Sequence, residues 1–164
     1  MEISPDYQKI IAWTQLSTIQ LIEATTLSLL NSYSPTNPSA GSTKTVTFSM
    51  DSSLVILETD TFNPIQILRT TDLSLVYEVP VSYIVFEAHF VNSSNEFIIV
   101  FAQTTTFVVN LTSGNQYPIQ YFDGVDFATD FDNNLFVCQN NVITQTSLSI
   151  EYIPPPPLLP SKDD

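Results

Sequence analysis

One pattern recurs four times along the chain, and this repeat limits the fold more than any other feature of the sequence. A short apolar run begins at residues 10, 54, 97 and 135, at separations of 44, 43 and 38 residues. The four runs are IIAW, LVIL, FIIV and LFVC. Each is bounded by polar turn residues, is rich in β-branched or aromatic side chains and is too short for a helix. Each therefore predicts a strand that is buried on both faces.

The flanks of each run repeat as well. Upstream, an apolar residue leads into a polar turn at residues 3–6, 48–51, 90–93 and 129–132. Asp, Asn and Pro favour such turns, because Asp and Asn bond nearby amides and Pro presets φ. Downstream, a second strand is expected at 18–23, 65–69, 105–110 and 142–145, and another at 27–30, 73–77, 116–119 and 148–152. Each unit of about 40 residues thus offers up to four consecutive strands, which predicts an all-β protein.

Two segments resemble the WD40 repeat family. Residues 107–114 (FVVNLTSG) resemble the end of a WD40 blade, where an apolar strand closes on Trp-Asp before a Ser/Thr-Gly turn. Residues 3–6 (ISPD) resemble the Phe-Ser-Pro-Asp turn between the first two strands of a blade. The Trp-Asp pair itself is replaced at 22–23, 68–69, 109–110 and 144–145, and no Gly-His pair precedes any blade. The structural Asp-His-Ser/Thr-Trp network of the family is therefore not expected here.

This resemblance implies an all-β propeller segment of about four four-stranded antiparallel blades over residues 1–152, with the first blade truncated. The repeats are expected at about 1–34, 45–79, 86–120 and 125–152. Propellers have about 4–8 blades, and closing the ring removes open sheet edges and apolar blade faces. Three arrangements stay open: a segment of a longer propeller, a ring completed by another chain, and a closed ring of four blades.

The net charge of the chain limits the classes of partner that it can bind. It has 164 residues, of which 17 are acidic and 4 are basic, for a net charge of −13. So few basic residues predict no binding to nucleic acid or to an anionic membrane surface. A charged protein partner should instead present a basic surface. Only 3 Gly and a single cysteine, Cys138, argue against a phosphate-binding loop and a disulfide framework.

No basic region leads into an apolar stretch at the N-terminus, and the longest apolar run, 97–102, is far short of the roughly 20 residues needed to cross a bilayer. These features predict a cytoplasmic protein. The sequons at Asn92 and Asn110 leave a secreted, Ser/Thr/Asn-rich structural or adhesive protein as an alternative, which a glycan at either site would favour.

Two Pro-rich segments interrupt the repeat. Residues 31–45 predict a long loop between the first two units. Residues 153–164 predict a proline-rich tail, in which Pro154, Pro155, Pro156 and Pro157 form a polyproline II helix. This run is either a ligand for an aromatic-lined groove of the SH3, WW or EVH1 kind or a stiff spacer that ends the last strand.

The inventory of chemical groups favours a non-catalytic protein without a cofactor or a metal. His89 is the only histidine and lies on an expected strand, and Cys138 lies in an apolar strand where a thiol acts as a small hydrophobe. Asp130, Asp132 and Asn134 have the spacing of the first ligands of an EF-hand. The pattern then fails, because the Gly and Glu that it requires are replaced by leucine and asparagine at positions 135 and 141.

Several aromatic residues fall near expected strand ends, where exposed rings would be binding anchors and buried rings would be core. They are Trp13, Phe62, Tyr77, Tyr83, Tyr117, Tyr121 and Phe122. The sequence as a whole predicts a protein–protein interaction or scaffold module. One alternative is a fragment of a propeller enzyme, hydrolase or quinoprotein-like, whose active residues lie outside this chain.

Overall fold

The computed structural model of the protein describes residues 1–14, 18–34, 43–59, 64–81, 84–91, 95–103, 105–119, 126–129, 134–139 and 142–147. Every regular element in these ranges is a β-strand, which confirms the all-β prediction. The ranges contain no helix of the length and apolarity that crossing a membrane requires.

The strands form four separate antiparallel sheets, each made of consecutive strands, and we call these sheets blades 1 to 4. Blade 1 contains β1 (Glu2–Ile3), β2 (Lys9–Trp13), β3 (Ile19–Glu23) and β4 (Leu29–Tyr33). Blade 2 contains β5 (Thr43–Phe48), β6 (Leu54–Thr59), β7 (Ile65–Arg69) and β8 (Leu75–Val79). Blade 3 contains β9 (Val85–Phe90), β10 (Phe97–Ala102), β11 (Thr105–Asn110) and β12 (Gln116–Ile119). The described part of blade 4 contains β13 (Asp126–Thr129), β14 (Asn134–Gln139) and β15 (Val142–Ser147).

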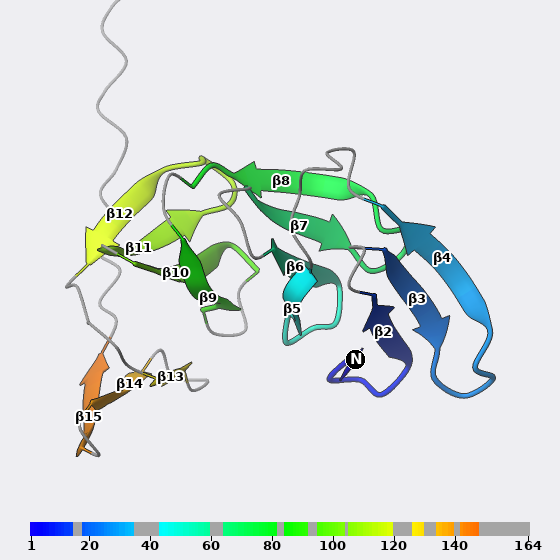
Figure 1. The fold of residues 1–164 in the computed structure, drawn as a ribbon, viewed down its shortest axis with the longest axis horizontal. Coiled ribbons are helices and arrows are strands. Elements are labelled where there is room, and N and C mark those ends of the chain that lie inside the picture. The colour runs from blue at the N-terminus through cyan, green and yellow to red at the C-terminus, as the bar shows by residue number, and fades with distance from the viewer. Residues whose placement is uncertain are drawn as a thin grey trace, which may run out of the picture.

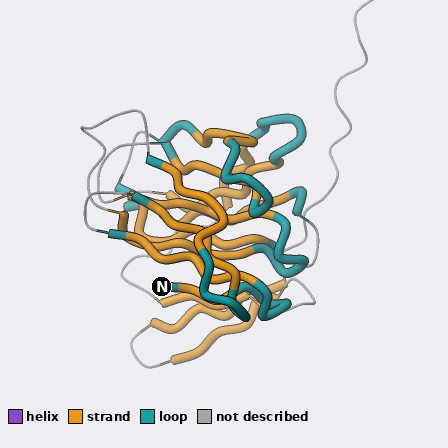
Figure 2. The backbone as a smooth tube through the Cα atoms, turned by 90° about the vertical axis from the view of Figure 1, so that its right-hand side faces the viewer, coloured by secondary structure: helices purple, strands orange, loops and turns teal. Residues whose placement is uncertain are grey.

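The blades follow one another along an arc (Figure 1). The first strands of neighbouring blades lie close together, since β5 contacts both β1 and β9. The fourth strands β4, β8 and β12 lie along the outside of the arc, and blades 1 and 4 lie at its two ends. Most of the described turns gather on the side of the molecule that lies to the right in Figure 2.

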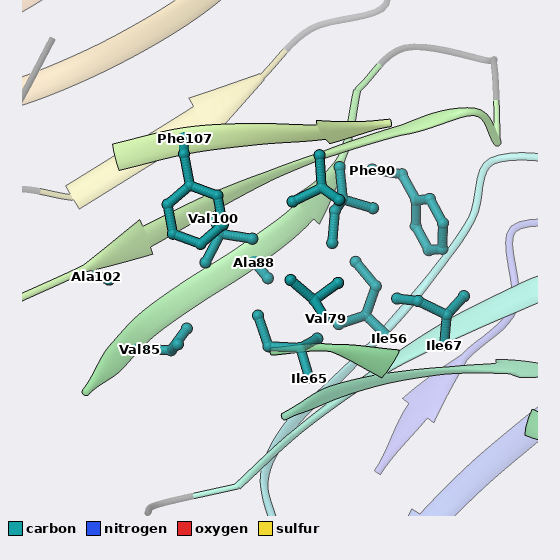
Figure 3. Packing of buried hydrophobic residues seen from close by; sticks show 12 residues of the cluster. Ile56, Ile65, Ile67, Val79, Val85, Ala88, Phe90, Val100, Ala102 and Phe107 are labelled. Atoms are coloured by element: carbon teal, nitrogen blue, oxygen red, sulfur yellow. The ribbon is translucent and has the colours of Figure 1, made fainter. Parts of the chain in front are cut away.

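Two apolar layers hold the arc together. One lies between blades 1 and 2 and includes Ile11, Leu21 and Leu57, which are fully buried. The other lies between blades 2 and 3 (Figure 3), where Ile56 and Ile67 face residues of blade 3 such as Val100. Strand β6 contributes Val55 and Leu57 to the first layer and Ile56 to the second, so both faces of blade 2 are covered, which explains why the run that begins at 54 is uninterrupted and apolar.

The loop expected at 31–45 is shorter than predicted. Strand β4 continues to Tyr33, because Tyr33 and Asn31 pair in register with Ile19 and Leu21 of β3. Strand β5 already begins at Thr43, where a β-branched residue pairs with Thr59. The strand expected at 148–152 lies outside the described residues.

Candidate functional site

One side of the molecule is formed by turns that join the first strand to the second and the third to the fourth in blades 1 to 3. We call it the turn face and define it as residues 4–8, 24–28, 49–53, 70–74, 95–96 and 111–115. Within each of blades 1 to 3 a backbone hydrogen bond joins the two turns: Ala24 N donates to Gln8 O, Thr70 N to Ser53 O, and Leu111 N to Glu96 O. The same end of these three blades is therefore closed in the same way.

The first turn of blade 1 is held by a serine and an aspartate. Ser4 Oγ accepts from Lys9 N at 2.9 Å and donates to Asp6 Oδ1 at 2.6 Å, while Gln8 N donates to the same carboxylate oxygen at 3.0 Å. Ser4 is buried and Asp6 is exposed. The predicted turn at residues 3–6 is thus a Ser-x-Asp turn in which each polar side chain satisfies a backbone amide.

Blade 2 repeats this turn bond for bond. Ser49 Oγ accepts from Leu54 N at 2.9 Å and donates to Asp51 Oδ1 at 2.8 Å, and Ser53 N donates to Asp51 Oδ1 at 3.0 Å. Both turns also hold one residue in the left-handed region, Tyr7 at φ 59° and Ser52 at φ 61°. The Ser-x-Asp turn is therefore a repeated structural unit of the chain.

The turns of neighbouring blades are bonded to each other. Asp6 N donates to Ser52 Oγ at 3.1 Å, which joins blade 1 to blade 2. Asn95 Nδ2 donates to Asp51 Oδ2 at 2.7 Å and to Ser53 Oγ at 2.8 Å, which joins blade 3 to blade 2. The turn face thus behaves as one preorganised surface rather than as separate loops.

The aspartates of the turn face are held in the ionised state. Hydrogen bonds from Ser4 and from the Gln8 amide lower the pKa of Asp6, and Ser74 does the same for the pKa of Asp72. For Asp51, partial burial raises the pKa, but the bonds from Asn95, Ser53 and Ser49 outweigh it and lower the pKa to about 2. Three fixed negative charges therefore lie on this face, and Met50 stands beside them with 41% of its surface exposed.

A second group of ionisable residues lies inside the arc, between blades 2 and 3. Glu58, on β6, is 1% exposed, and its Oε1 accepts from Ala88 N of β9 at 2.6 Å. Burial raises the pKa of Glu58 to about 7, although Lys44 and His89 oppose the shift. Lys44 Nζ in turn donates to the Phe86 carbonyl oxygen.

The histidine of this group faces its own strand. His89 Nε2 lies 2.8 Å from Glu87 Oε1, and the ring packs edge-on against Phe101 with centroids 6.5 Å apart. The contact with His89 keeps the pKa of Glu87 below its ordinary value. A buried carboxyl that lies beside a histidine and has a pKa near 7 is one mark of an acid–base site. Here the carboxyl is covered by blade 3 and bonded to its backbone, an arrangement that joins two blades.

The structure places the predicted site residues unevenly. Trp13 and Tyr77 pack against the two apolar layers, and Tyr117 is half-buried on β12. Asn134 begins β14, and Cys138 lies on the same strand, paired with Asp126 and Ile143. The remaining predicted residues lie outside the described ranges: Phe62, Tyr83, Asn92, Tyr121, Phe122, Asp130, Asp132, Pro154, Pro155, Pro156 and Pro157.

The structure also reveals residues that sequence reasoning missed. Glu58 follows a run of four apolar residues on β6, and an acidic residue at the end of a buried strand was a usable signal. The second Ser-x-Asp turn, with Ser49 and Asp51, lies where the sequence predicted a polar turn at 48–51, and the structure adds the hydrogen bonds that hold it. Within the described ranges, no group of three or more His, Cys, Asp or Glu side chains could hold a metal ion.

Sequence comparisons give no family, since no family model and no curated protein matches the chain. Solved structures do match. The Cps50 (Swd1) β-propeller domain of Myceliophteria thermophila superposes with a TM-score of 0.69 at 8% identity, over 83% of this chain and 49% of that one. The dihydro-heme d1 dehydrogenase NirN gives a TM-score of 0.67 at 14% identity, over 90% and 34%. The computationally designed protein Ika4 gives 0.64 at 12% identity, over 85% of each chain.

This chain spans about half the length of the Swd1 domain and about a third of NirN. At these identities the likeness concerns the fold alone. It agrees with the successive four-stranded antiparallel sheets, with the repeated turns and with the arc that they form. The chain has a β-propeller fold, in which successive antiparallel blades follow one another along an arc.

Proposed function

We propose that the chain is a non-catalytic protein-interaction module that binds a basic partner through its turn face. The observation that supports this most directly is the repeated Ser-x-Asp turn, which fixes Asp6 and Asp51 as ionised groups on hydrogen-bonded backbone. A rigid surface loses little conformational entropy when a partner binds. The exposed Met50 adds an adaptable apolar contact among these charges.

The overall charge of −13 supports a basic partner. Complementary charge mainly raises the association rate and weakens as salt is added. The ring of His89 packs edge-on against Phe101 of the neighbouring strand, which is typical of a structural histidine. The presence of a single histidine and a single cysteine in the sequence also led to the prediction of a scaffold.

The proposal includes a cytoplasmic location, which the environment of Asn110 supports. Asn110 Nδ2, the atom that a glycan would occupy, donates to Glu96 Oε1 at 3.2 Å, and Oδ1 accepts from the amides of Thr112 and Ser113. A mass shift of the natural protein after removal of N-linked glycans would contradict the cytoplasmic location and favour the secreted alternative.

Charge neutralisation without loss of the turn tests the binding face. In Asp6→Asn/Asp72→Asn the amide oxygens still accept from Gln8 and Ser74, so the turns keep their hydrogen bonds while two charges are removed. The control Glu2→Gln/Glu78→Gln removes the same number of exposed charges away from the turn face. Partners can be found by photo-crosslinking from a methionine analogue, which would label Met1 and Met50.

The dissociation constant of a crosslinked partner is then measured for the three proteins. We expect the turn-face variant to bind about 10-fold more weakly, which corresponds to about 1.4 kcal/mol, and the control to bind like the wild type. Equal weakening in both variants would show that net charge, and not the turn face, recruits the partner. Unchanged binding in both would place the interaction elsewhere.

A further inference from the structure

The inner blades of the arc are covered on both faces, and the way they are covered defines a direction. Blade 2 packs on blade 1 through one face, which includes Phe48 and Leu73, and on blade 3 through the other, which includes Ile56 and Ile67. We call the face toward the preceding blade the backward face and the face toward the following blade the forward face. Both apolar layers between blades 1, 2 and 3 join a forward face to a backward face.

The backward face of blade 1 is open. The Ser-x-Asp turns align Ile3 with Phe48, at a spacing of 45 residues, and the left-handed turn residues Leu27 and Leu73 correspond at a spacing of 46. Ile3 is 49% exposed where Phe48 is 7% exposed, and Leu27 is 71% exposed where Leu73 is 3% exposed. Blade 1 therefore carries the side chains of a packed face without a neighbour to pack on.

The open face is continuous across the sheet. Ile3 pairs with Ile10 and Ile10 pairs with Ile22, so three isoleucines lie side by side on three strands, with Ile3 exposed and the other two half-buried. At the edge of this row Tyr7 is 79% exposed, whereas its counterpart Ser52 is 2% exposed and bonds to the turn of the preceding blade. The turn of blade 1 thus lacks the same neighbour that its strands lack.

The forward face of blade 4 is open too. The hairpins β10–β11 and β14–β15 each have six pairs in the same register, so Ile143 corresponds to Thr106 and Gln145 to Val108. Thr106 and Val108 are 1% and 2% exposed. Ile143 is 70% exposed, and Gln145 is exposed as well. The described part of the forward face of blade 4 is therefore uncovered at these two positions.

We propose that a second copy of this chain covers both open faces, with blade 4 of each copy packed on blade 1 of the other. One open face is a forward face and the other is a backward face, which is the combination found in both apolar layers within the chain. A single partner of the same sequence can therefore cover both faces at once. The assembly would hold four blades from each copy, within the range of about 4–8 that propeller rings contain. Its contact is head-to-tail, and the second contact closes it into a ring.

This inference is independent of the proposed function, because the blade faces and the turn face are different surfaces. Its test is the solution mass of the 164-residue chain by sedimentation equilibrium at several protein concentrations. We expect a species of about twice 18.3 kDa that dissociates on dilution. A chain that stays at 18.3 kDa at all concentrations, or one that forms ever longer species as concentration rises, would overturn the closed pair.

Substitutions on each face identify the contact. Leu27→Asp places a charge on the open face of blade 1, and Asp tolerates the left-handed φ of 57° better than Leu does. Gln145→Lys alters the open face of blade 4 at an exposed polar position, where folding is not at risk. Leu75→Asp is the control, since Leu75 is an exposed leucine on β8 of blade 2, and blade 2 already has a neighbouring blade on each side.

We expect Leu27→Asp and Gln145→Lys each to lower the fraction of dimer at least 10-fold, while Leu75→Asp leaves it unchanged. Mixing the two interface variants should restore part of the dimer, because blade 4 of the first and blade 1 of the second are intact. A dimer that survives Leu27→Asp, or one that a mixture fails to restore, would overturn the head-to-tail arrangement.

Discussion

The environment of Glu58 depends on how blade 3 packs against blade 2. Its carboxyl is buried where blade 3 covers the end of β6, and the Ala88 amide donates to Oε1 at 2.6 Å. The other oxygen, Oε2, is buried without a hydrogen-bond partner. An ionised carboxylate is costly in such a place, so the protonated form is favoured after folding.

The stability of the protein should therefore depend on Glu58 between about pH 4.5 and pH 7. The unfolded chain releases this proton near 4.5 and the folded chain near 7. The contribution of Glu58 to the free energy of unfolding is thus complete below pH 4.5 and falls by about 3 kcal/mol as the pH rises to 7. Glu58→Gln keeps an oxygen for the Ala88 amide and cannot ionise, so its stability should lack this fall.

Chemical denaturation at a series of pH values measures the difference between the wild type and Glu58→Gln. The control is Glu78→Gln, which removes an exposed carboxyl on β8. Curves for Glu58→Gln and the wild type that stay parallel from pH 4.5 to pH 7 would show that Glu58 is ionised in the folded protein.

At the scale of elements, the Ser-x-Asp turn determines where blades 1 and 2 begin their second strands. In blade 2 the buried Ser49 hydroxyl accepts a hydrogen bond from the amide of Leu54, the first residue of β6. This bond fixes the register of β5 against β6. Because register decides which side chains reach each apolar layer, this single hydroxyl supports the packing on both sides of the blade.

Ser49→Ala should destabilise the protein by about 2 kcal/mol, since it leaves the half-buried Leu54 amide without its partner. The pKa of Asp51 should also rise, because one of its donors is lost. Thermal melting measures the first effect, and a carboxyl titration by NMR measures the second. Ser32→Ala, at an exposed strand position, is the matched control and should stay within about 0.5 kcal/mol of the wild type.

At the scale of the whole molecule, the net charge of −13 opposes compaction. Like charges repel over about 30 Å at 0.01 M salt and over about 8 Å at 0.15 M salt. The melting temperature should therefore rise between these two salt concentrations at pH 7. Near the isoelectric point of about 4.1 the same increase in salt should have little effect, and an equal rise at both pH values would mean that charge repulsion is not the cause.

The sequence by itself determined the strands and the turns. Apolar runs at regular spacing require two covered faces, and Ser, Asp and Pro bond or preset the nearby backbone, so both signals are local. That is why the strands at 65–69, 105–110 and 116–119 lie where they were predicted. The loop at 31–45 was predicted too long, because polar residues such as Thr43 can still pair with a neighbouring strand.

Only the tertiary structure decided what lies between the blades. The burial of Glu58 depends on β9, which lies some 30 residues away in sequence. Leu27 is exposed because no blade packs against the backward face of blade 1. A local pattern shows that a side chain is apolar or ionisable. Whether it is covered depends on segments distant in the chain or on a second molecule, because burial is a property of the surface that packs against it.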